Sequence, residues 1–113
     1  MQPRSPGWLF DMLQAANLIE QATAGRSFAD YDADPLLRSA VERQFQIIGE
    51  AIGRLARHDP DTANQFEDYP AIIALRNVLV HGYDQVDNAR LWGIIQRHLP
   101  PLQRKVRELL DAL

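Results

Sequence analysis

Four prolines stand at the expected starts of amphipathic helices, and they constrain the fold of this chain more than any other feature. They occur in the pairs Ser5-Pro6, Asp34-Pro35, Asp59-Pro60 and Tyr69-Pro70. Proline suits the first position of a helix because no amide donor is needed there, and Ser or Asp before it serves as the N-cap. Three of the four pairs fit that rule, and all four predict that a helix begins at the proline.

Apolar residues that recur at intervals of three and four predict the helices themselves. The expected segments are a helix over about 6–24 ended by Gly25, a capped turn or connector over 27–32, a helix over 35–57, a short helix over 60–66, a helix over 70–80 ended by Gly82, and a last helix after Asp87 that breaks or kinks at Leu99-Pro100-Pro101. No strand alternation or hairpin signal occurs in the sequence. The expected fold is therefore all-α, a single domain over 1–113 built as an antiparallel bundle of four or five helices.

The helix expected over 35–57 has a wide apolar face. One stripe consists of Leu37, Val41, Phe45, Ile48, Ile52 and Leu55, and a second consists of Leu36, Ala40, Ile47 and Ala51. A single partner helix needs less apolar surface than this, so the pattern predicts two neighbours, one of which could belong to another chain. Gly49 in the same helix permits a close approach by a neighbour.

Composition excludes several classes of protein. The 113 residues contain no cysteine, which excludes disulfides, thiolate metal sites and a cysteine nucleophile, and no His, Asp and Glu spacing is typical of a metal site. No apolar run approaches 18 residues and the start has no apolar signal segment, so a cytoplasmic protein without a membrane span is expected. The net charge of −3 disfavours general affinity for nucleic acid, although arginines gather in 38–57 and 90–107.

The segment 76–83, Arg-Asn-Val-Leu-Val-His-Gly-Tyr, places polar and charged groups at the end of an otherwise apolar helix. Arg76 offers a permanently charged fork that matches a phosphate, and His81 can accept or donate a proton near neutral pH. Phosphodiester cleavage without a metal requires these two functions. The structural alternative is that Arg76 pairs with a carboxylate and His81 complements the negative end of the helix dipole.

The spacing of Arg76, His81 and Tyr83 resembles the motif of HEPN ribonucleases, and more closely that of the HepT toxin branch. Two further segments, 40–51 and 86–102, resemble the second helix and the C-terminal part of that family, so the resemblance covers nearly the whole chain. It implies a HEPN-like bundle with a catalytic pair, Arg76 and His81. Asn77 and Glu50 are expected to support that pair, Asn77 by orienting backbone or His81 and Glu50 by pairing with Arg76 or Arg43, although a solvated Glu50 is an equal alternative.

The resemblance also implies a biological role. It predicts a metal-independent endoribonuclease toxin of a type VII-like toxin–antitoxin pair, which needs no cofactor, acts as a homodimer and leaves 2′,3′-cyclic phosphate and 5′-hydroxyl ends on its RNA substrate. The expected partner is a minimal nucleotidyltransferase antitoxin that attaches AMP to Tyr83, and the equal alternative for Tyr83 is a packing residue whose hydroxyl is bonded locally. The alternative is a noncatalytic HEPN helical module that only binds the nucleotidyltransferase.

The geometry of the motif poses a difficulty. Residues five positions apart on a regular α-helix lie about 140° apart around its axis, which would separate Arg76 from His81. We expect the long arginine stem, and a helix that loosens near Gly82, to bring both groups to one cleft. Of the other candidates, His58 is expected at a helix C-terminus, His98 beside the proline kink, and Trp8 and Trp92 in the core.

Overall fold

The structure is a computed structural model that describes residues 1–82 and 86–113. Its helices are α1 (Ser5–Thr23), α2 (Phe28–Ala33), α3 (Pro35–His58), α4 (Pro60–Ala63), α5 (Tyr69–His81), α6 (Asn88–Arg97) and α7 (Leu99–Asp111). The described residues include no β-strand. The predicted all-α class is confirmed.

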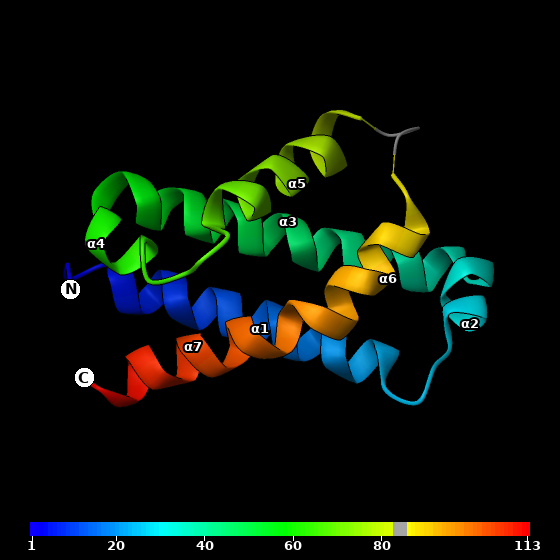
Figure 1. The fold of residues 1–113 in the computed structure, drawn as a ribbon, viewed down its shortest axis with the longest axis horizontal. Coiled ribbons are helices and arrows are strands. Elements are labelled where there is room, and N and C mark those ends of the chain that lie inside the picture. The colour runs from blue at the N-terminus through cyan, green and yellow to red at the C-terminus, as the bar shows by residue number, and fades with distance from the viewer. Residues whose placement is uncertain (83–85) are drawn as a thin grey trace.

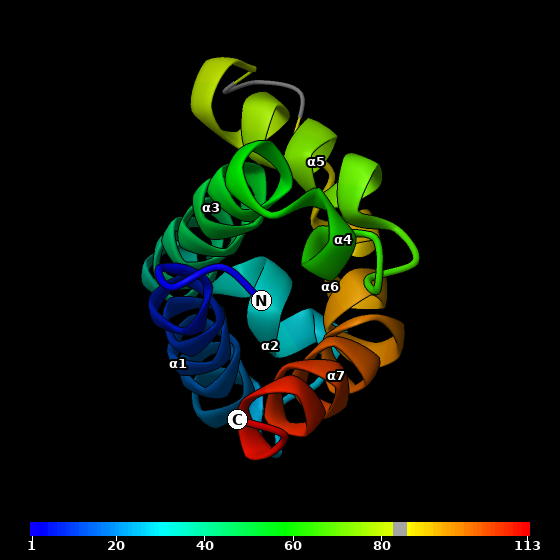
Figure 2. The same cartoon turned by 90° about the vertical axis from the view of Figure 1, so that its left-hand side faces the viewer.

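The helices form an antiparallel bundle whose fourth member is broken. Along the chain, α1, α3, α5 and the α6–α7 pair alternate in direction, and both termini lie at the same end (Figure 1). In the end-on view, α7, α1, α3 and α5 follow one another around the bundle (Figure 2). The chief contacts join α1 to α3, α3 to α5 and α1 to α7, whereas α5 has no comparable packing against α6 or α7. The bundle is therefore closed on three sides and open on the fourth.

The core lies mainly between α1, α3 and α7. Met12 and Ile19 of α1, Ile52 and Leu55 of α3, and Val106 of α7 are completely inaccessible to solvent. Each such side chain contributes about 1.5–3 kcal/mol through removal from water. Among the described helices, none combines the length and the hydrophobicity needed to cross a membrane.

Two of the three predicted proline-associated N-caps are present. Asp34 accepts hydrogen bonds from the amides of Leu36 and Leu37 at 3.1 Å each, and Asp59 accepts one from the Thr62 amide at 3.3 Å. The prediction for Ser5 is wrong, because α1 begins at Ser5 itself and has no side-chain cap. The Ser5 hydroxyl instead donates to the Asp59 carboxylate at 2.7 Å.

Asp59 joins the N-terminus of the chain to α4. Its buried carboxylate accepts hydrogen bonds from the Gln2 amide at 3.0 Å and from the hydroxyls of Ser5 and Thr62 at 2.7 Å each. These bonds, led by that from the Gln2 amide, hold the pKa of Asp59 well below its ordinary value despite burial. The carboxylate is thus a fixed, ionised anchor between the N-terminal residues and the start of α4.

Several segment boundaries differ from the sequence expectations. The connector over 27–32 is a true helix, α2, because Ser27 and Asp30 form a reciprocal capping box. The helix that starts at Pro60 ends at Ala63, short of residue 66. The break at the tandem prolines is confirmed, since α6 ends at Arg97 and α7 begins at Leu99.

Only part of the second stripe on α3 is covered. Ala51, in the C-terminal half of the helix, is 5% exposed. Leu36, at the start of the stripe, is 82% exposed. The two chief neighbours of α3 among the described helices are α1 and α5, but α5 packs on α3 at Gly49, on the side away from Ala51, so this stripe is not the surface that α5 covers.

Candidate active site on α5

The predicted catalytic residues lie on α5, which remains helical through His81. The Gly82 amide still donates to the Val78 carbonyl at 2.7 Å, which is an ordinary helical bond. The expected loosening near Gly82 is therefore wrong for the described residues, because the backbone bonds are retained through the end of the helix. Arg76 and His81 project from different sides of the same regular helix.

Arg76 lies in a close contact between α3 and α5, against Gly49. A Cβ atom added to Gly49 would stand 2.2 Å from the Arg76 Cβ and 3.5 Å from its Cα. Real side-chain atoms do not approach so closely, so only glycine allows α5 to lie at this depth against α3. The prediction that Gly49 permits close helix approach is confirmed, and the residue it accommodates is Arg76.

The Arg76 guanidinium is held by two polar neighbours. Its Nη2 lies 3.6 Å from the Glu50 carboxylate, and its Nη1 donates to the Asn77 side-chain oxygen at 3.2 Å. Glu50 also lies 4.0 Å from Arg43, so both pairings foreseen for Glu50 occur. The Arg76 Nε is buried and has no hydrogen-bond partner within the described part of the chain. The side chain is 30% exposed, which leaves part of the fork open to a ligand.

Asn77 provides a link between Arg76 and His81. Both Asn77 and His81 are exposed, and residues four apart on a helix lie on the same face with Cβ atoms about 5–6 Å from each other. The Asn77 oxygen accepts from Arg76, which leaves its amide nitrogen available as a donor. Asn77 therefore contacts Arg76 and shares a helical face with His81.

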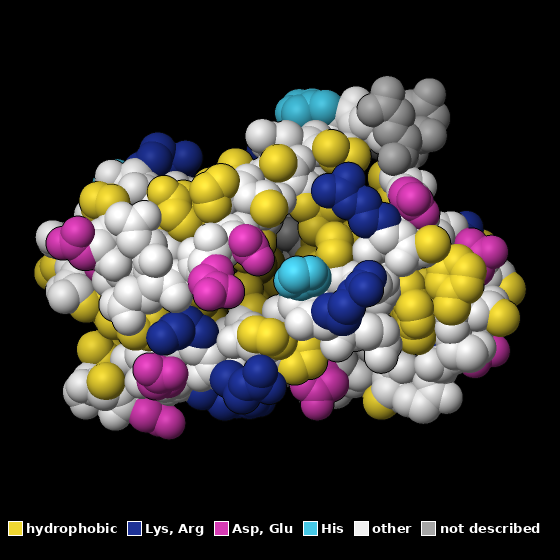
Figure 3. Space-filling view, viewed as in Figure 1, with side chains coloured by type: hydrophobic (Ala, Val, Ile, Leu, Met, Phe, Trp, Pro, Cys, Tyr) yellow, Lys and Arg dark blue, Asp and Glu magenta, His cyan; other side chains and the backbone are white. Residues whose placement is uncertain are grey.

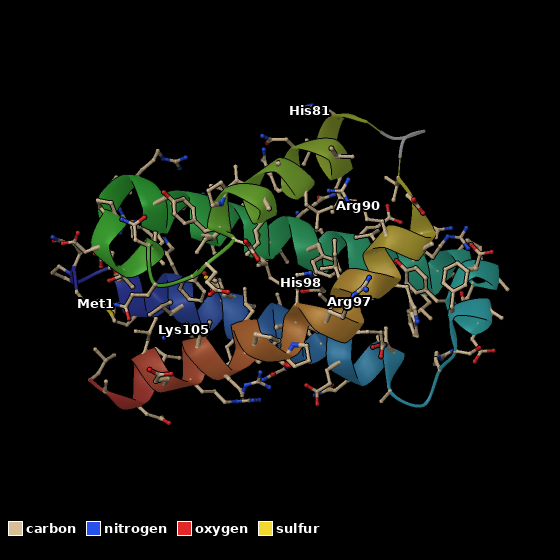
Figure 4. All side chains as sticks on the ribbon, in the orientation of Figure 1. Met1, His81, Arg90, Arg97, His98 and Lys105 are labelled. Atoms are coloured by element: carbon tan, nitrogen blue, oxygen red, sulfur yellow. The ribbon has the colours of Figure 1, made fainter. Side chains whose placement is uncertain are left out.

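The surface of α5 is unusually apolar around these polar groups. Only Leu79 of this helix is buried, while Ile72, Ile73, Leu75, Val78 and Val80 are half-buried. Figure 4 shows His81 at the C-terminal end of α5, away from Arg97 and His98 on the α6–α7 side. The motif thus lies beside apolar surface that the bundle itself leaves incompletely covered.

The sequence also singled out Tyr83, His58, Trp8 and Trp92. Tyr83, the predicted modification site, lies outside the described residues. His58 ends α3 and stacks on the buried ring of Trp8, with ring centroids 5.4 Å apart, as expected for core and helix-end residues. Trp92 is half-buried and packs on Tyr31. Within residues 1–82 and 86–113, no three His, Asp or Glu side chains gather closely enough to hold a metal ion.

One surface feature was missed by the reasoning from sequence. Arg90, Arg97, His98 and Lys105 line a groove between α5 and α6–α7. Figure 3 shows basic and acidic side chains around a hollowed hydrophobic strip on this face. The sequence did contain an indication of this basic surface. Arg90 and Arg97 are seven residues apart, as are His98 and Lys105, and this spacing places the two members of each pair on one helical face.

Comparison with known proteins decides the family. Residues 12–109 match the profile described as "Ribonuclease HepT-like". The chain belongs to the HepT-like ribonuclease family. No solved structure matched the chain.

Relatives of this HepT-like chain include three that share its length. "Putative RNase TTE0752" of Caldanaerobacter subterraneus subsp. tengcongensis is 30% identical over 104 residues, 92% of each chain. "Putative RNase MJ1380" of Methanocaldococcus jannaschii is 30% identical over 101 residues, 88% of this chain and 90% of the relative. "Probable ribonuclease HepT" of Thermococcus cleftensis is 30% identical over 102 residues, 90% and 92% respectively. Family and relatives together support ribonuclease activity with RNA as the substrate.

Proposed function

We propose that this HepT-like chain is the metal-independent endoribonuclease toxin of a toxin–antitoxin pair, with Arg76 and His81 as its catalytic residues. The observation that carries the proposal is the Arg76–Asn77–His81 arrangement on α5. A cation fixed beside Asn77 is followed, one turn later on the Asn77 face, by an exposed imidazole. RNA supplies its own nucleophile, so its cleavage requires only proton transfer and charge stabilisation, for which these two residue types are suited.

The chemistry follows from the RNA backbone. The 2′-hydroxyl attacks the adjacent phosphorus while its proton passes to a base, and the bond from phosphorus to the 5′-oxygen breaks as that oxygen takes up a proton. The products are a 2′,3′-cyclic phosphate and a 5′-hydroxyl. His81 is the group suited to the proton transfers, and Arg76 stabilises the charge that develops on the phosphate oxygens.

Glu50 and Asn77 have supporting roles in this proposal. Glu50 is placed 3.6 Å from the guanidinium and Asn77 at 3.2 Å, so together they fix the direction of the Arg76 fork. The incoming phosphate would meet the open part of that fork. Asn77 would also orient His81 through its free amide nitrogen.

A homodimer would complete the site. One histidine serves both proton transfers poorly, and a two-fold axis beside α5 would bring a second Arg76 and His81 to the same cleft. The half-buried aliphatic residues of α5, including Ile73, Val78 and Val80, provide apolar surface for such an interface. Light scattering at micromolar concentration should report a dimer, and a monomer would contradict this part of the proposal. A mixture of Arg76→Ala and His81→Ala chains that regains activity would show that the two chains share a site.

Cleavage of total RNA by the purified chain in EDTA tests the proposed activity. The wild type should cleave, and His81→Ala and Arg76→Ala should each lose activity by a factor of about 100 or more, as expected for a proton-transfer or charge-stabilising group. Asp61→Ala, at an exposed position of α4, is the matched control and should retain full activity. Cleavage that survives in both motif variants would reject the assigned roles.

The rival function is a noncatalytic HEPN module that binds a nucleotidyltransferase. It is favoured by one observation: both terminal nitrogens of Arg76 already contact protein groups, Glu50 and Asn77. In that case the wild type would be inactive on RNA but would still form a complex with the nucleotidyltransferase. The same cleavage assay, paired with a pull-down of that partner, separates the two functions.

Control by AMP transfer to Tyr83 forms the regulatory part of the proposal. Tyr83 follows His81 by two residues in sequence, so a phosphate attached to its hydroxyl would add negative charge close to the motif. Coexpression with the nucleotidyltransferase should add the mass of AMP to Tyr83 and stop cleavage. If Tyr83→Phe is still fully silenced by the partner, inhibition must act through binding alone.

A further inference from the structure

The open side of the bundle is a groove with an apolar floor. Its volume is about 830 Å³, and its lining falls into two stretches of the chain, 65–75 and 90–105. Its aliphatic floor is formed by Ile72 and Leu75 from α5, and by Ile94 of α6 and Leu102 of α7 from the other side. The packing that joins α5 to α3 is absent between α5 and α6–α7, which explains why the groove exists.

The wall formed by α6 and α7 is basic. Arg90, Arg97 and Lys105 line it, and that wall contributes no Asp or Glu to the groove. Arg90 and Arg97 are two turns apart on α6, about 10 Å along its axis. Among the described residues neither has a carboxylate within ion-pair distance, whereas Lys105 lies 3.5 Å from Glu108. Figure 4 shows Arg90, Arg97 and His98 together on this side of the molecule.

Gly93 helps to set Arg97 in the groove. A Cβ atom at Gly93 would stand 2.6 Å from the Arg97 Nη2, so the guanidinium lies over a part of α6 that has no side chain. Both residues line the groove. The guanidinium therefore lies close to the helix surface at the edge of the groove, where Arg97 is exposed to a ligand.

The opposite wall is acidic. Glu67 and Asp68, immediately before α5, are its only ionisable lining residues, and both are exposed. Neither forms an ion pair with any residue in the described part of the chain. The α5 side of the groove is thus acidic near the start of α5, and the α6–α7 side is basic, with aliphatic residues between them (Figure 3).

We propose that this groove binds an amphipathic α-helix of a partner protein, with acidic residues on the edge that faces α6–α7. An apolar stripe at intervals of three and four would fill the floor, as in other helix-in-groove complexes. Its acidic edge would meet Arg90 and Arg97, and a basic edge would meet Glu67 and Asp68. The occupant would complete the side of the bundle that α5 leaves open.

Single-stranded RNA fits the groove less well. Its phosphates would be repelled by Glu67 and Asp68, and RNA-binding grooves usually offer exposed aromatic rings on which bases stack. Phe66, the aromatic side chain of the acidic wall, is only 5% exposed. The floor consists of Ile and Leu side chains, which suit the knobs of a helix. This proposal is independent of the assigned catalytic residues.

A displayed library of helical peptides tests the proposal on the full chain. The peptides would be about four turns long, with leucines fixed on one stripe and each flanking edge varied between Glu, Lys and Ser. Selected peptides should carry Glu on one edge and Lys on the other. By anisotropy, such a peptide should bind about tenfold more tightly than its edge-exchanged isomer, the ratio expected from about 1.4 kcal/mol of charge complementarity.

Two charge-matched variants localise the binding. In Arg90→Glu/Arg97→Glu the preferred peptide should lose its advantage, and selection on that variant should favour Lys on the former acidic edge. In Arg54→Glu/Arg104→Glu, exposed positions outside the groove with the same charge change, binding should be unaffected. Circular dichroism verifies that each variant is folded. Arg90→Ser/Arg97→Ser, which removes the two positive charges without reversing them, is a milder variant for the same test.

Two results would overturn the proposal. One is a selection that yields no peptides, or peptides without a charge preference. The other is binding of a fluorescent oligouridylate that depends on Arg90 and Arg97 while peptide binding does not, which would assign the groove to RNA. Failure of this test leaves the proposed RNA cleavage untouched, because that activity is measured without a peptide and depends on Arg76 and His81.

Discussion

Gly49 of α3 and Arg76 of α5 are in such close contact that a Cβ atom on the glycine would stand 2.2 Å from the Cβ of the arginine. Substitution Gly49→Ala must therefore push α5 away from α3 or bend one of the helices. Overpacking of this kind costs about 1–3 kcal/mol, so the melting temperature should fall by several degrees and RNA cleavage should fall with it.

Gly53 provides the matched control for that substitution. It lies one turn further along α3, and the nearest atom that a Cβ there would meet is the tip of Arg57 at 3.9 Å. Gly53→Ala should be neutral or stabilising by up to about 1 kcal/mol, because alanine favours the helix. Equal effects of the two substitutions in thermal unfolding would show that the Gly49–Arg76 contact does not determine the helix spacing.

The Glu50 carboxylate is predicted to position Arg76. The pair is partly exposed, so Glu50→Gln should change the free energy of unfolding by less than about 1 kcal/mol. If the carboxylate orients the guanidinium for the transition state, kcat for RNA cleavage should fall about tenfold with a smaller change in KM. Arg43→Gln removes the other neighbour of Glu50, 4.0 Å away, and should leave kcat nearly unchanged. A change in KM alone in Glu50→Gln, with kcat unchanged, would instead indicate that Glu50 competes with the RNA phosphate for Arg76.

Asp59 should make the free energy of unfolding depend on pH in the acid range. Its pKa in the folded chain lies below the unfolded value of 3.8, so its contribution is complete above about pH 4 and is lost as pH falls through the folded-state pKa. Near pH 7, Asp59→Asn should cost about 2 kcal/mol or more, since several hydrogen bonds to a charged group are weakened. In urea unfolding, the difference from wild type should shrink below pH 4. Exposed Asp61→Asn should have little effect, and a constant Asp59→Asn deficit down to pH 2 would refute the linkage.

Tyr31 is predicted to tolerate loss of its hydroxyl. The ring is fully buried on Trp92, and its oxygen has no hydrogen-bond partner among the described residues. Tyr31→Phe should therefore raise the free energy of unfolding by about 1 kcal/mol. Burial raises the pKa of Tyr31 to about 12, so the folded chain keeps the proton that the unfolded chain loses above pH 10. The difference in the free energy of unfolding between Tyr31→Phe and the wild type should thus widen above pH 10. A variant less stable than the wild type at neutral pH would contradict the prediction.

Much of the fold could be predicted because its determinants are local. The buried stripe of α3, from Leu37 to Leu55, follows from helical periodicity, and the caps at Asp34 and Asp59 follow from side chains beside their own helices. Ser5 escaped this reasoning because its hydroxyl bonds to Asp59, 54 residues away in sequence. Capping rules consider only residues that are close in sequence, so they cannot identify this partner.

The candidate site was only partly predictable for the same reason. The residue types of Arg76, Asn77 and His81 and the presence of Gly49 are visible in the sequence, and a glycine inside a long helix indicates a close neighbour. Which helix fills that space depends on the packing of α5 against α3. The groove was hidden because it results from packing that α5 and α6–α7 do not make: the spacing of Arg90 and Arg97 indicates a basic helical face, but not the gap beside it.

The central claim, that Arg76 and His81 promote attack by the 2′-hydroxyl of RNA, is tested most directly with a matched pair of oligonucleotides. One is an RNA cleaved at a mapped position, and the other is identical except for a single 2′-deoxy substitution on the 5′ side of the scissile phosphate. The wild type in EDTA should cut the first to a 2′,3′-cyclic phosphate and a 5′-hydroxyl, as identified by mass spectrometry, and should leave the second intact at that position. Equal cleavage of both, with 3′-hydroxyl and 5′-phosphate ends, would contradict the account.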